Sequence, residues 1–367
     1  MTRSAIEEPD SMSLSSPKAG RVVSLDQFRG YTVAGMVLVN FLGGFASVPA
    51  WLKHHNTYTS YPDTIMPQFF FAVGFAYRLT FLKRREREGA AAAFAGVVRR
   101  SLGLILLGVV LYHLDGRAKD WAELQKLGLW GFLSTAFQRD PFQTLVHIGI
   151  TSLWVLPVIG AGALGRVPFL LGSAALHVWL SSQFYYQWVV NRPGIDGGPL
   201  GFLSWTIPLL VGSLTFDAAA KADGRMVGKL TTWAVGLMAL GYGLSCLGGT
   251  MAEPPFVPPS GPVNLWTMSQ RAGSVSYLTF ASGFALVVYA LFVVACDRGN
   301  LQAGLFRTFG RNALAAYILH DLVARAVRPY VPGDAPLWYA LAGFAVSFGI
   351  TYLFVRHLEK SETFLRL

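Results

Sequence analysis

Residues 25–81 read LDQFRGYTVAGMVLVNFLGGFASVPAWLKHHNTYTSYPDTIMPQFFFAVGFAYRLTF, and this stretch decides the fold. It contains two apolar segments of bilayer length, joined by a polar hairpin that carries His54, His55 and Asp63. Asn40 lies well inside the first segment, where an amide costs free energy unless it has a partner or lines a wet cavity. Polar groups beside a histidine pair in such a setting indicate a functional site in a membrane protein.

The composition extends this pattern to the whole chain. Of the 367 residues, 53% are hydrophobic and 14% are charged. About ten windows approach the ~20 apolar residues that a spanning helix needs. They are 29–48, 64–82, 101–114, 142–162, 166–183, 200–216, 227–248, 274–296, 305–327 and 335–355. The sequence therefore predicts an all-α integral membrane protein, a bundle of about ten transmembrane helices with cytoplasmic N- and C-termini.

The ends of the chain are predicted to lie outside the membrane. The first twenty residues are polar and lack the short apolar core and cleavage site of a signal peptide. We expect a disordered cytoplasmic tail over residues 1–23, a transmembrane domain over 24–357 and a second cytoplasmic tail over 358–367. A plasma or inner membrane would suit this organisation.

The formal net charge of +10 follows from membrane topology rather than from nucleic-acid binding. With the N-terminus inside, most lysines and arginines fall in cytoplasmic segments, as the positive-inside rule requires. The segment 83–100 (KRREREGAAAAFAGVVRR) is either a topogenic loop near anionic lipid headgroups or a cation cluster for an anionic ligand. In the window 305–327, Arg311, Asn312 and His320 are costly in lipid, so we expect them to face the protein interior.

The first hairpin carries the candidate residues for chemistry. A histidine such as His54 or His55 titrates near neutral pH and can transfer a proton, or it can attack an acyl thioester through a neutral ring nitrogen. Asp63 either caps the second helix or orients the histidine. Asn40 either bonds another helix or donates its amide to a carbonyl oxygen. No HExxH, paired CxxC or Walker A motif occurs, so we expect no metal site.

Several motifs together resemble one known family. They are LDQFRG (25–30), VNFLGG (39–44), LKHH (52–55), PDTIMPQFFFAVG (62–74), DGGPLGFLSWTIPLLVGSL (196–214), NLWTMSQ (264–270) and RNALAAYILHDL (311–322). This set resembles the heparan-α-glucosaminide N-acetyltransferase family of membrane acyltransferases, from about residue 24 to residue 355. The chain is expected to be a bacterial-type homologue that lacks the N-terminal extracytoplasmic domain.

The resemblance implies a function and a set of site residues. The family moves an acetyl group from cytoplasmic acetyl-CoA to an amino sugar on the far side of the membrane. By position, the family's active-site histidine falls on His54, with His55 as a rival, and its asparagine and aspartate fall on Asn40 and Asp63. The loop NTYTSY (56–61) departs from the family pattern, and so does the spacing between Asn40 and His54.

We accordingly expect a transmembrane acyltransferase that uses acetyl-CoA as co-substrate. The groups expected to bind the coenzyme are Arg29, Arg84, Arg85, Arg311 and Asn312. The expected acceptor is an extracytoplasmic glycan or amino sugar, contacted by Trp266 and His320. Membrane lipids are further partners, a homodimer is compatible with the family, and no nucleic acid is expected. The alternative is a transporter or carrier of a sugar or lipid-linked sugar without chemistry.

Overall fold

A computed structural model of the chain describes residues 22–55, 57–113, 118, 120–136, 142–192, 196–221, 224–248 and 255–365. Within these ranges the regular structure is helical and no strand occurs. The α-helices are α1 (Val23–Leu42), α2 (Tyr61–Glu88), α3 (Ala90–His113), α4 (Trp121–Ala136), α5 (Thr144–Ile159), α6 (Ala163–Leu180), α7 (Tyr186–Val190), α8 (Phe202–Ala220), α9 (Met226–Ser245), α10 (Val275–Phe292), α11 (Gly304–Arg311), α12 (Ala313–Val327) and α13 (Leu337–Lys360). Short 3₁₀ or π segments are η1 (Ala50–Leu52), η2 (Ser181–Tyr185), η3 (Gly198–Leu200), η4 (Cys246–Gly248), η5 (Val293–Arg298) and η6 (Arg328–Tyr330).

Seven helical stretches in the described part of the chain are long and apolar enough to cross a membrane. They are Tyr61–Glu88, Ala90–Tyr112, Ala163–Val190, Gly198–Ala220, Met226–Gly248, Val275–Arg298 and Leu337–Lys360. The chain is therefore an integral, multi-pass membrane protein. Each of the ten sequence windows overlaps a helix, but α1, α5 and α11–α12 fall short of these limits, so the expected number of about ten spans is not confirmed.

The window 305–327 is not one helix, because the chain breaks at Asn312. This residue has φ −122° and ψ 44°, between the end of α11 and the start of α12. Its side-chain Nδ2 donates to the carbonyl oxygen of Thr363 at 3.1 Å, while Arg311 bonds Glu359. Arg311 and the amide nitrogen of Asn312 thus find partners at Glu359 in α13 and at Thr363 just beyond it. Helix α13 itself continues to Lys360, beyond the domain boundary expected at residue 357.

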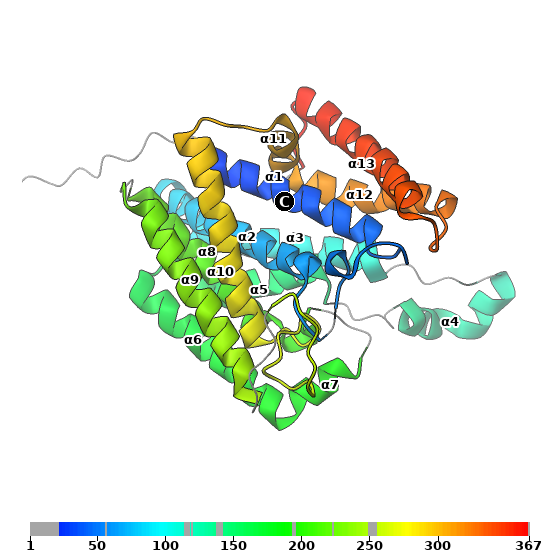
Figure 1. Cartoon of the computed structure of the whole chain (residues 1–367), viewed down its shortest axis with the longest axis horizontal. Helices are drawn as coiled ribbons and strands as arrows, with labels where there is room; N and C mark the ends of the chain where they lie inside the picture. The colour runs from blue at the N-terminus through cyan, green and yellow to red at the C-terminus, as the bar shows by residue number, and fades with distance from the viewer. Residues whose placement is uncertain are drawn as a thin grey trace, which may run out of the picture.

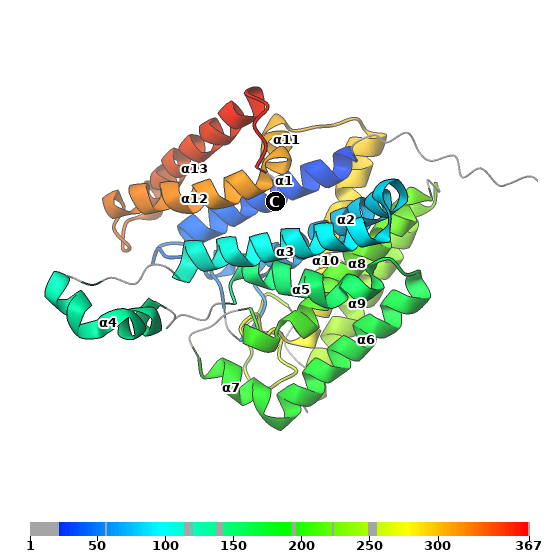
Figure 2. The same ribbon diagram turned by 180° about the vertical axis from the view of Figure 1, so that it is seen from behind.

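Helix α2 is central to the bundle. It packs against α8, α3, α1 and α10, with α3 and α5 lying side by side next to it (Figures 1 and 2). The contact with α8 is at backbone distance, since a Cβ at Gly74 would meet the backbone of Leu209 and a Cβ at Gly212 would meet that of Phe71. Small residues at such crossings let membrane helices gain van der Waals contact. Helix α4 stands away from the bundle in both views.

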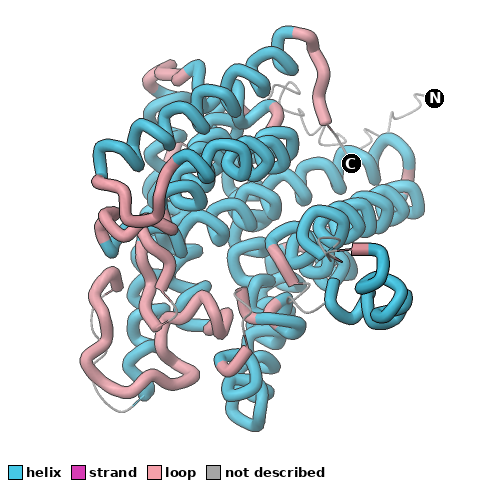
Figure 3. Tube along the Cα trace, turned by 90° about the vertical axis from the view of Figure 1, so that its right-hand side faces the viewer, coloured by secondary structure: helices cyan, strands magenta, loops and turns pink. Residues whose placement is uncertain are grey.

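The two ends of the bundle differ in chemistry. The long loops gather on one side of the molecule (Figure 3), where the backbone N–H of Phe256 donates to the carbonyl oxygen of Thr59 at 2.9 Å. Along α2, Asp63 lies at this end and Arg84 near the other, 21 residues or about 32 Å apart at 1.5 Å per residue. That distance matches the ~30 Å hydrocarbon thickness of a bilayer. We call the end near Asp63 the histidine face and the end near Arg84 the arginine face.

An ion cluster of two buried arginines and a partly exposed aspartate joins α2, α6 and α8 near the arginine face. Arg78 Nε lies 3.1 Å from Asp217 Oδ1, and the other carboxylate oxygen accepts from Arg166, whose side chain has no exposed surface. Arg166 also donates to Ser213 Oγ at 2.8 Å, and Arg78 donates to the carbonyl oxygen of Ile159. Asp217 is thus the carboxylate shared by two guanidinium groups from different helices.

Removing this carboxylate should destabilise the protein strongly. Asp217→Asn leaves two poorly hydrated cations without their counter-charge, and we expect a loss of about 3 kcal/mol in the free energy of unfolding. Equilibrium denaturation in mixed micelles measures it. The matched control is Asp321→Asn, which breaks an exposed i,i+4 pair with Arg325 and should cost about 0.5 kcal/mol. Equal losses in the two variants would contradict a structural role for the cluster.

Candidate active site

The hairpin between α1 and α2 presents His54 at the start of the second helix. Pro49 precedes the single turn η1, and Ser60, with φ −110° and ψ 178°, is the N-cap of α2. The backbone N–H of Ser60 donates to Asp63 Oδ2 at 2.8 Å, and the hydroxyl of Ser60 donates to the same oxygen at 2.7 Å. An acidic side chain that reaches back to the N-cap in this way satisfies a backbone donor of the first turn.

Asp63 makes both of the contacts that the sequence left open. Its Oδ2 caps the helix, while its Oδ1 lies 2.8 Å from Nδ1 of His54. The carboxyl group has no exposed surface, and the carbonyl oxygen of the same residue accepts a bond from the hydroxyl of Tyr277 at 2.5 Å. The carboxylate is therefore held by the helix start and cannot turn away from the histidine without losing the cap.

The hydrogen bonds described for the His54 ring are made by Nδ1. Nδ1 of His54 lies within hydrogen-bond distance of two oxygens, Asp63 Oδ1 at 2.8 Å and Gln270 Oε1 at 3.1 Å. An ionised carboxylate only accepts, so this network assigns the proton to Nδ1 and leaves the lone pair of the neutral ring on Nε2. The side chain is 42% exposed. A substrate can therefore reach a histidine whose tautomer is suited to proton abstraction or nucleophilic attack.

Negative charge around the ring changes its acidity. Burial alone lowers the pKa of His54, but the hydrogen bond and charge of Asp63, the charge of Asp196 and the bond to Gln270 outweigh it. The net result is a pKa raised above the ordinary value of 6.5. A base with a pKa nearer to neutrality combines a useful neutral fraction with a stronger affinity for the proton it must take.

His55 lies in a different environment. Its Nε2 bonds the carbonyl oxygen of Ala50 at 2.8 Å, and its ring stacks on Tyr58 with centroids 4.1 Å apart. The contacts described for it include no carboxylate partner. Between the two histidines that the sequence could not separate, the geometry of an oriented base belongs to His54.

Asn40 and His320, which the sequence assigns to different roles, are bonded to each other. Asn40 Nδ2 lies 3.1 Å from His320 Nε2, and His320 Nδ1 bonds the carbonyl oxygen of Tyr317 at 2.5 Å. A carbonyl only accepts, so Nδ1 carries the proton and Nε2 accepts from the amide. This contact is the helix–helix bond foreseen for Asn40. His320 is buried and bonded to the amide, which does not favour the direct acceptor contact expected for it.

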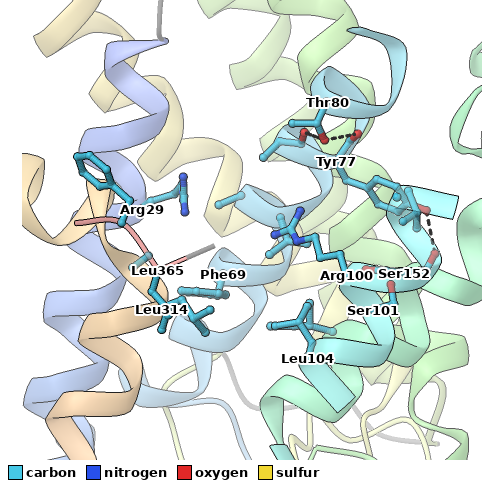
Figure 4. Close-up of a pocket in the computed structure, with 18 of the residues that line it drawn as sticks. Arg29, Phe69, Tyr77, Thr80, Arg100, Ser101, Leu104, Ser152, Leu314 and Leu365 are labelled. Atoms are coloured by element: carbon cyan, nitrogen blue, oxygen red, sulfur yellow. Dashed lines mark hydrogen bonds between the residues drawn. The ribbon is translucent and has the colours of Figure 1, made fainter. Parts of the chain in front are cut away.

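A cavity of about 880 Å³ opens at the arginine face. Its lining includes five arginines, Arg29, Arg84, Arg99, Arg100 and Arg311, against three acids, Asp26, Glu359 and Glu362. Figure 4 shows Arg29 and Arg100 on opposite walls, with both side chains directed into the space between them. Deeper in, the lining becomes largely apolar, with Phe69, Val73, Leu104, Leu145 and Leu314. The cavity thus joins a cationic mouth to an apolar interior.

Some of the residues expected to bind the coenzyme line this cavity, and others lie outside its lining. Arg29, Arg84 and Arg311 line the cavity, whereas Arg85 and Asn312 do not. Neither His54 nor Asn40 lines it. Arg84 pairs with Glu88 at 2.8 Å and Arg311 with Glu359 at 3.1 Å, so both guanidinium groups already have an acidic neighbour.

The sequence also missed residues that contribute to these sites. Arg99 and Arg100 lie in the basic segment 83–100, where nothing in the sequence distinguishes them from the other cations. Gln270 and Asp196, near His54, lie inside the motifs NLWTMSQ and DGGPLG, so their position in the resemblance was the only available signal. Trp266 is half-buried, and its backbone N–H donates to Asn264 Oδ1 at 2.8 Å.

Fold and site together define a multi-pass membrane protein with an oriented histidine on one face and a cationic cavity on the other. Heparan-alpha-glucosaminide N-acetyltransferase of Mus musculus is 25% identical over 368 aligned residues, which cover 83% of this chain and 54% of the mouse protein. The Homo sapiens protein of the same name is 23% identical over 367 residues, covering 82% and 53%. These two matches support membership of the heparan-alpha-glucosaminide N-acetyltransferase family at a distant level.

The similarity to these relatives is partial. The chain spans about half the length of the curated relatives it matches. No protein-family model matches it.

The raised pKa of His54 predicts a pH-dependent contribution to stability. Because folding favours the protonated ring, the contribution is full below the ordinary pKa of 6.5 and is lost as the pH rises through the higher folded value. Thermal unfolding of wild type and His54→Gln should therefore differ more at about pH 5.5 than at about pH 8.5. His55→Gln is the matched control and should show a smaller change. A His54 difference that grows with pH would contradict the assignment.

Proposed function

We infer that the protein is a membrane acyltransferase that moves an acetyl group from acetyl-CoA, bound at the arginine face, to an amine or hydroxyl of a sugar at the histidine face. The observation that carries this proposal is the separation of two chemistries along α2. The carboxylate-bound His54 lies near Asp63, and the cationic cavity opens beside Arg84, about 32 Å away along the helix. The names of the two relatives, both N-acetyltransferases, support the same reaction class.

The cationic mouth suits the nucleotide end of coenzyme A. This cofactor carries a diphosphate and a further phosphate on its ribose, and arginine is the side chain best shaped to bind phosphate oxygens in pairs. Five arginines exceed the three acids around the same cavity, so the mouth keeps an excess of positive charge. By the positive-inside rule this face would be cytoplasmic, where acetyl-CoA is available.

The apolar interior suits the pantetheine arm and would bring the thioester toward the histidine face. From Arg84 to Phe69 the cavity follows α2 for 15 residues, about 22 Å. Another six residues, about 9 Å along the axis, separate Phe69 from Asp63. Tyr317, on the cavity wall, bonds the hydroxyl of Tyr112 at 2.7 Å. In the proposal, the reactive end of the cofactor crosses this last part of the path beside the tyrosine pair.

At the histidine face two routes lead to the same products. In the covalent route, Nε2 of His54 attacks the thioester carbonyl, the C–S bond breaks, and coenzyme A leaves as a thiolate. The acceptor nitrogen or oxygen then attacks the acetyl-imidazole, the bond to Nε2 breaks, and the proton lost by the acceptor ends on the thiolate. In the direct route, the acceptor attacks the thioester carbonyl while His54 takes its proton, the C–S bond breaks, and the proton then passes from His54 to the coenzyme A thiolate. Asp63 stabilises the protonated ring in the direct route.

Asn40 has a specific place in either route. Only one of its two amide hydrogens is used in the bond to His320, so the other can donate to the carbonyl oxygen on which negative charge develops. His320 would then position the amide rather than contact the sugar.

Acetyl-CoA binding tests the donor half of the proposal. The double variant Arg84→Gln, Arg100→Gln removes two cavity cations, and each lost arginine–phosphate contact should weaken binding about tenfold or more. Calorimetry on the detergent-purified chain measures the Kd. The matched control is Arg85→Gln, Arg87→Gln, which makes the same charge change on α2 outside the cavity lining. Equal weakening in both doubles, or absence of binding to wild type, would contradict this donor site.

Turnover measurements test the part of the proposal that assigns acetyl transfer to His54. His54→Ala should lower acetyl transfer to D-glucosamine by at least about a hundredfold, because it removes the base or nucleophile, while acetyl-CoA affinity stays within about twofold of wild type. Release of free coenzyme A upon addition of the amino sugar is the readout, which also separates an enzyme from a carrier. His55→Ala is the control and should retain most activity. Full activity of His54→Ala would remove this residue from the mechanism.

A further inference from the structure

We propose that Gln270 and Asp196 are positioning residues for His54: the Asp196 carboxylate fixes the amide of Gln270, and the amide oxygen then holds Nδ1–H of the histidine beside Asp63. This inference rests on the proposed function, because it assigns two further residues to the histidine that performs the transfer. Nothing in the sequence spacing links them, since Gln270 is 216 residues from His54 and Asp196 is 74 residues from Gln270.

The direction of each hydrogen bond links Asp196 to His54 through Gln270. Gln270 Nε2 donates to Asp196 Oδ1 at 2.7 Å, and a carboxylate cannot donate in return. The amide nitrogen therefore faces Asp196, and Oε1 faces His54, from whose Nδ1 it lies 3.1 Å. An amide turned the other way would bring its N–H₂ group against the Nδ1–H, donor against donor. Asp196 thus acts on His54 through the orientation of Gln270.

Both of these side chains are buried. Gln270 is 6% exposed and Asp196 is 1% exposed, and a buried carboxylate must be hydrogen-bonded to be tolerated. A chain that needed only to fill this space could use apolar side chains. Instead, two polar side chains from distant loops are placed in series and end on the imidazole, as outer partners of reactive groups do.

The two loops that carry Asp196 and Gln270 are joined tightly through their backbones. Asp196 adopts φ +69°, a left-handed conformation that is uncommon for residues other than glycine, and its carbonyl oxygen accepts from Trp205 Nε1 at 2.7 Å. The backbone N–H of Gly197 donates to the carbonyl oxygen of Arg271 at 3.1 Å. A Cβ at Gly197 would lie 3.1 Å from the Cα of Gly273, so the two loops touch through their backbones. Strain of this kind persists only where the surroundings enforce it.

The charges around the His54 ring determine the direction in which its pKa should change when the Asp196 charge is removed. The groups that act on His54 are Asp63 at the start of α2, Asp196 before η3 and Gln270 before α10. Tyr58 and Tyr277 lie close enough to Asp63 to be affected by its charge. Both carboxylates favour the protonated imidazole, so loss of the Asp196 charge should populate the neutral ring at lower pH.

The test uses full-length protein in detergent, with His55→Gln as the background so that His54 is the reactive histidine of its peptide. Asp196→Asn keeps an acceptor oxygen for Gln270 and tolerates the left-handed conformation, so it removes only the charge. Gln270→Met removes the acceptor on Nδ1. The control is Gln27→Met, which likewise deletes a buried amide that both donates and accepts, toward Ala303 at the arginine face.

The primary readout is the pH dependence of His54 carbethoxylation by diethyl pyrocarbonate, followed by mass spectrometry. This reagent attacks the neutral ring and needs no turnover. Asp196→Asn and Gln270→Met should move the midpoint to lower pH, and Gln27→Met should not. The kcat for acetyl transfer to D-glucosamine should fall about tenfold in both, with unchanged acetyl-CoA affinity.

Failure of the positioning role and failure of the proposed function would give different results. Unmoved midpoints in both variants, with kcat no lower than in Gln27→Met, would overturn the positioning role while the acyltransferase proposal stands. Wild-type protein without any acetyl transfer would instead overturn the proposed function, and the midpoints would still decide whether Asp196 and Gln270 control the histidine.

Discussion

The arrangement of the histidine face depends on one buried carboxylate. Asp63 uses one oxygen to close the first turn of α2 and the other to hold His54 at 2.8 Å. Because the same carboxylate caps α2 and bonds the histidine, the orientation of the His54 ring is tied to the fold of the central helix. A reactive side chain on a loop gains in this way the precision of a regular element. In this partly exposed side chain, Nε2 is then the ring nitrogen offered to whatever approaches the histidine face.

Helix α2 also connects the histidine face to the arginine face. Helix α2 carries Asp63 near one end and Arg84 near the other, and a cavity with a cationic mouth follows it inward to Phe69. Close backbone packing at Gly74 and Gly212, together with the ion cluster on Asp217, holds the helix against α8 and α6. In the proposed reaction, the helix therefore acts as the common support of donor and acceptor chemistry across the membrane thickness.

Much of this could be predicted from the sequence, for identifiable reasons. Long apolar windows indicate helices because lipid leaves the backbone no other partner, and each of the ten windows overlaps one. The pairing of His54 with Asp63 could be foreseen because the two residues are nine positions apart in one hairpin. The features that could not be predicted from the sequence depend on tertiary contacts. At the break between α11 and α12, Asn312 bonds the distant Thr363, and the partners Gln270 and Asp196 come from loops with no periodic signal.

The most direct test of the account is the sidedness of the reaction. The purified chain would be reconstituted into liposomes, its orientation determined by protease access to the segment 83–100, with D-glucosamine enclosed and labelled acetyl-CoA added outside. In vesicles whose arginine face is outward, the account predicts labelled N-acetylglucosamine inside and free coenzyme A outside. Labelled product in the compartment that holds the acetyl-CoA, with amino sugar supplied there, would contradict transfer across the membrane.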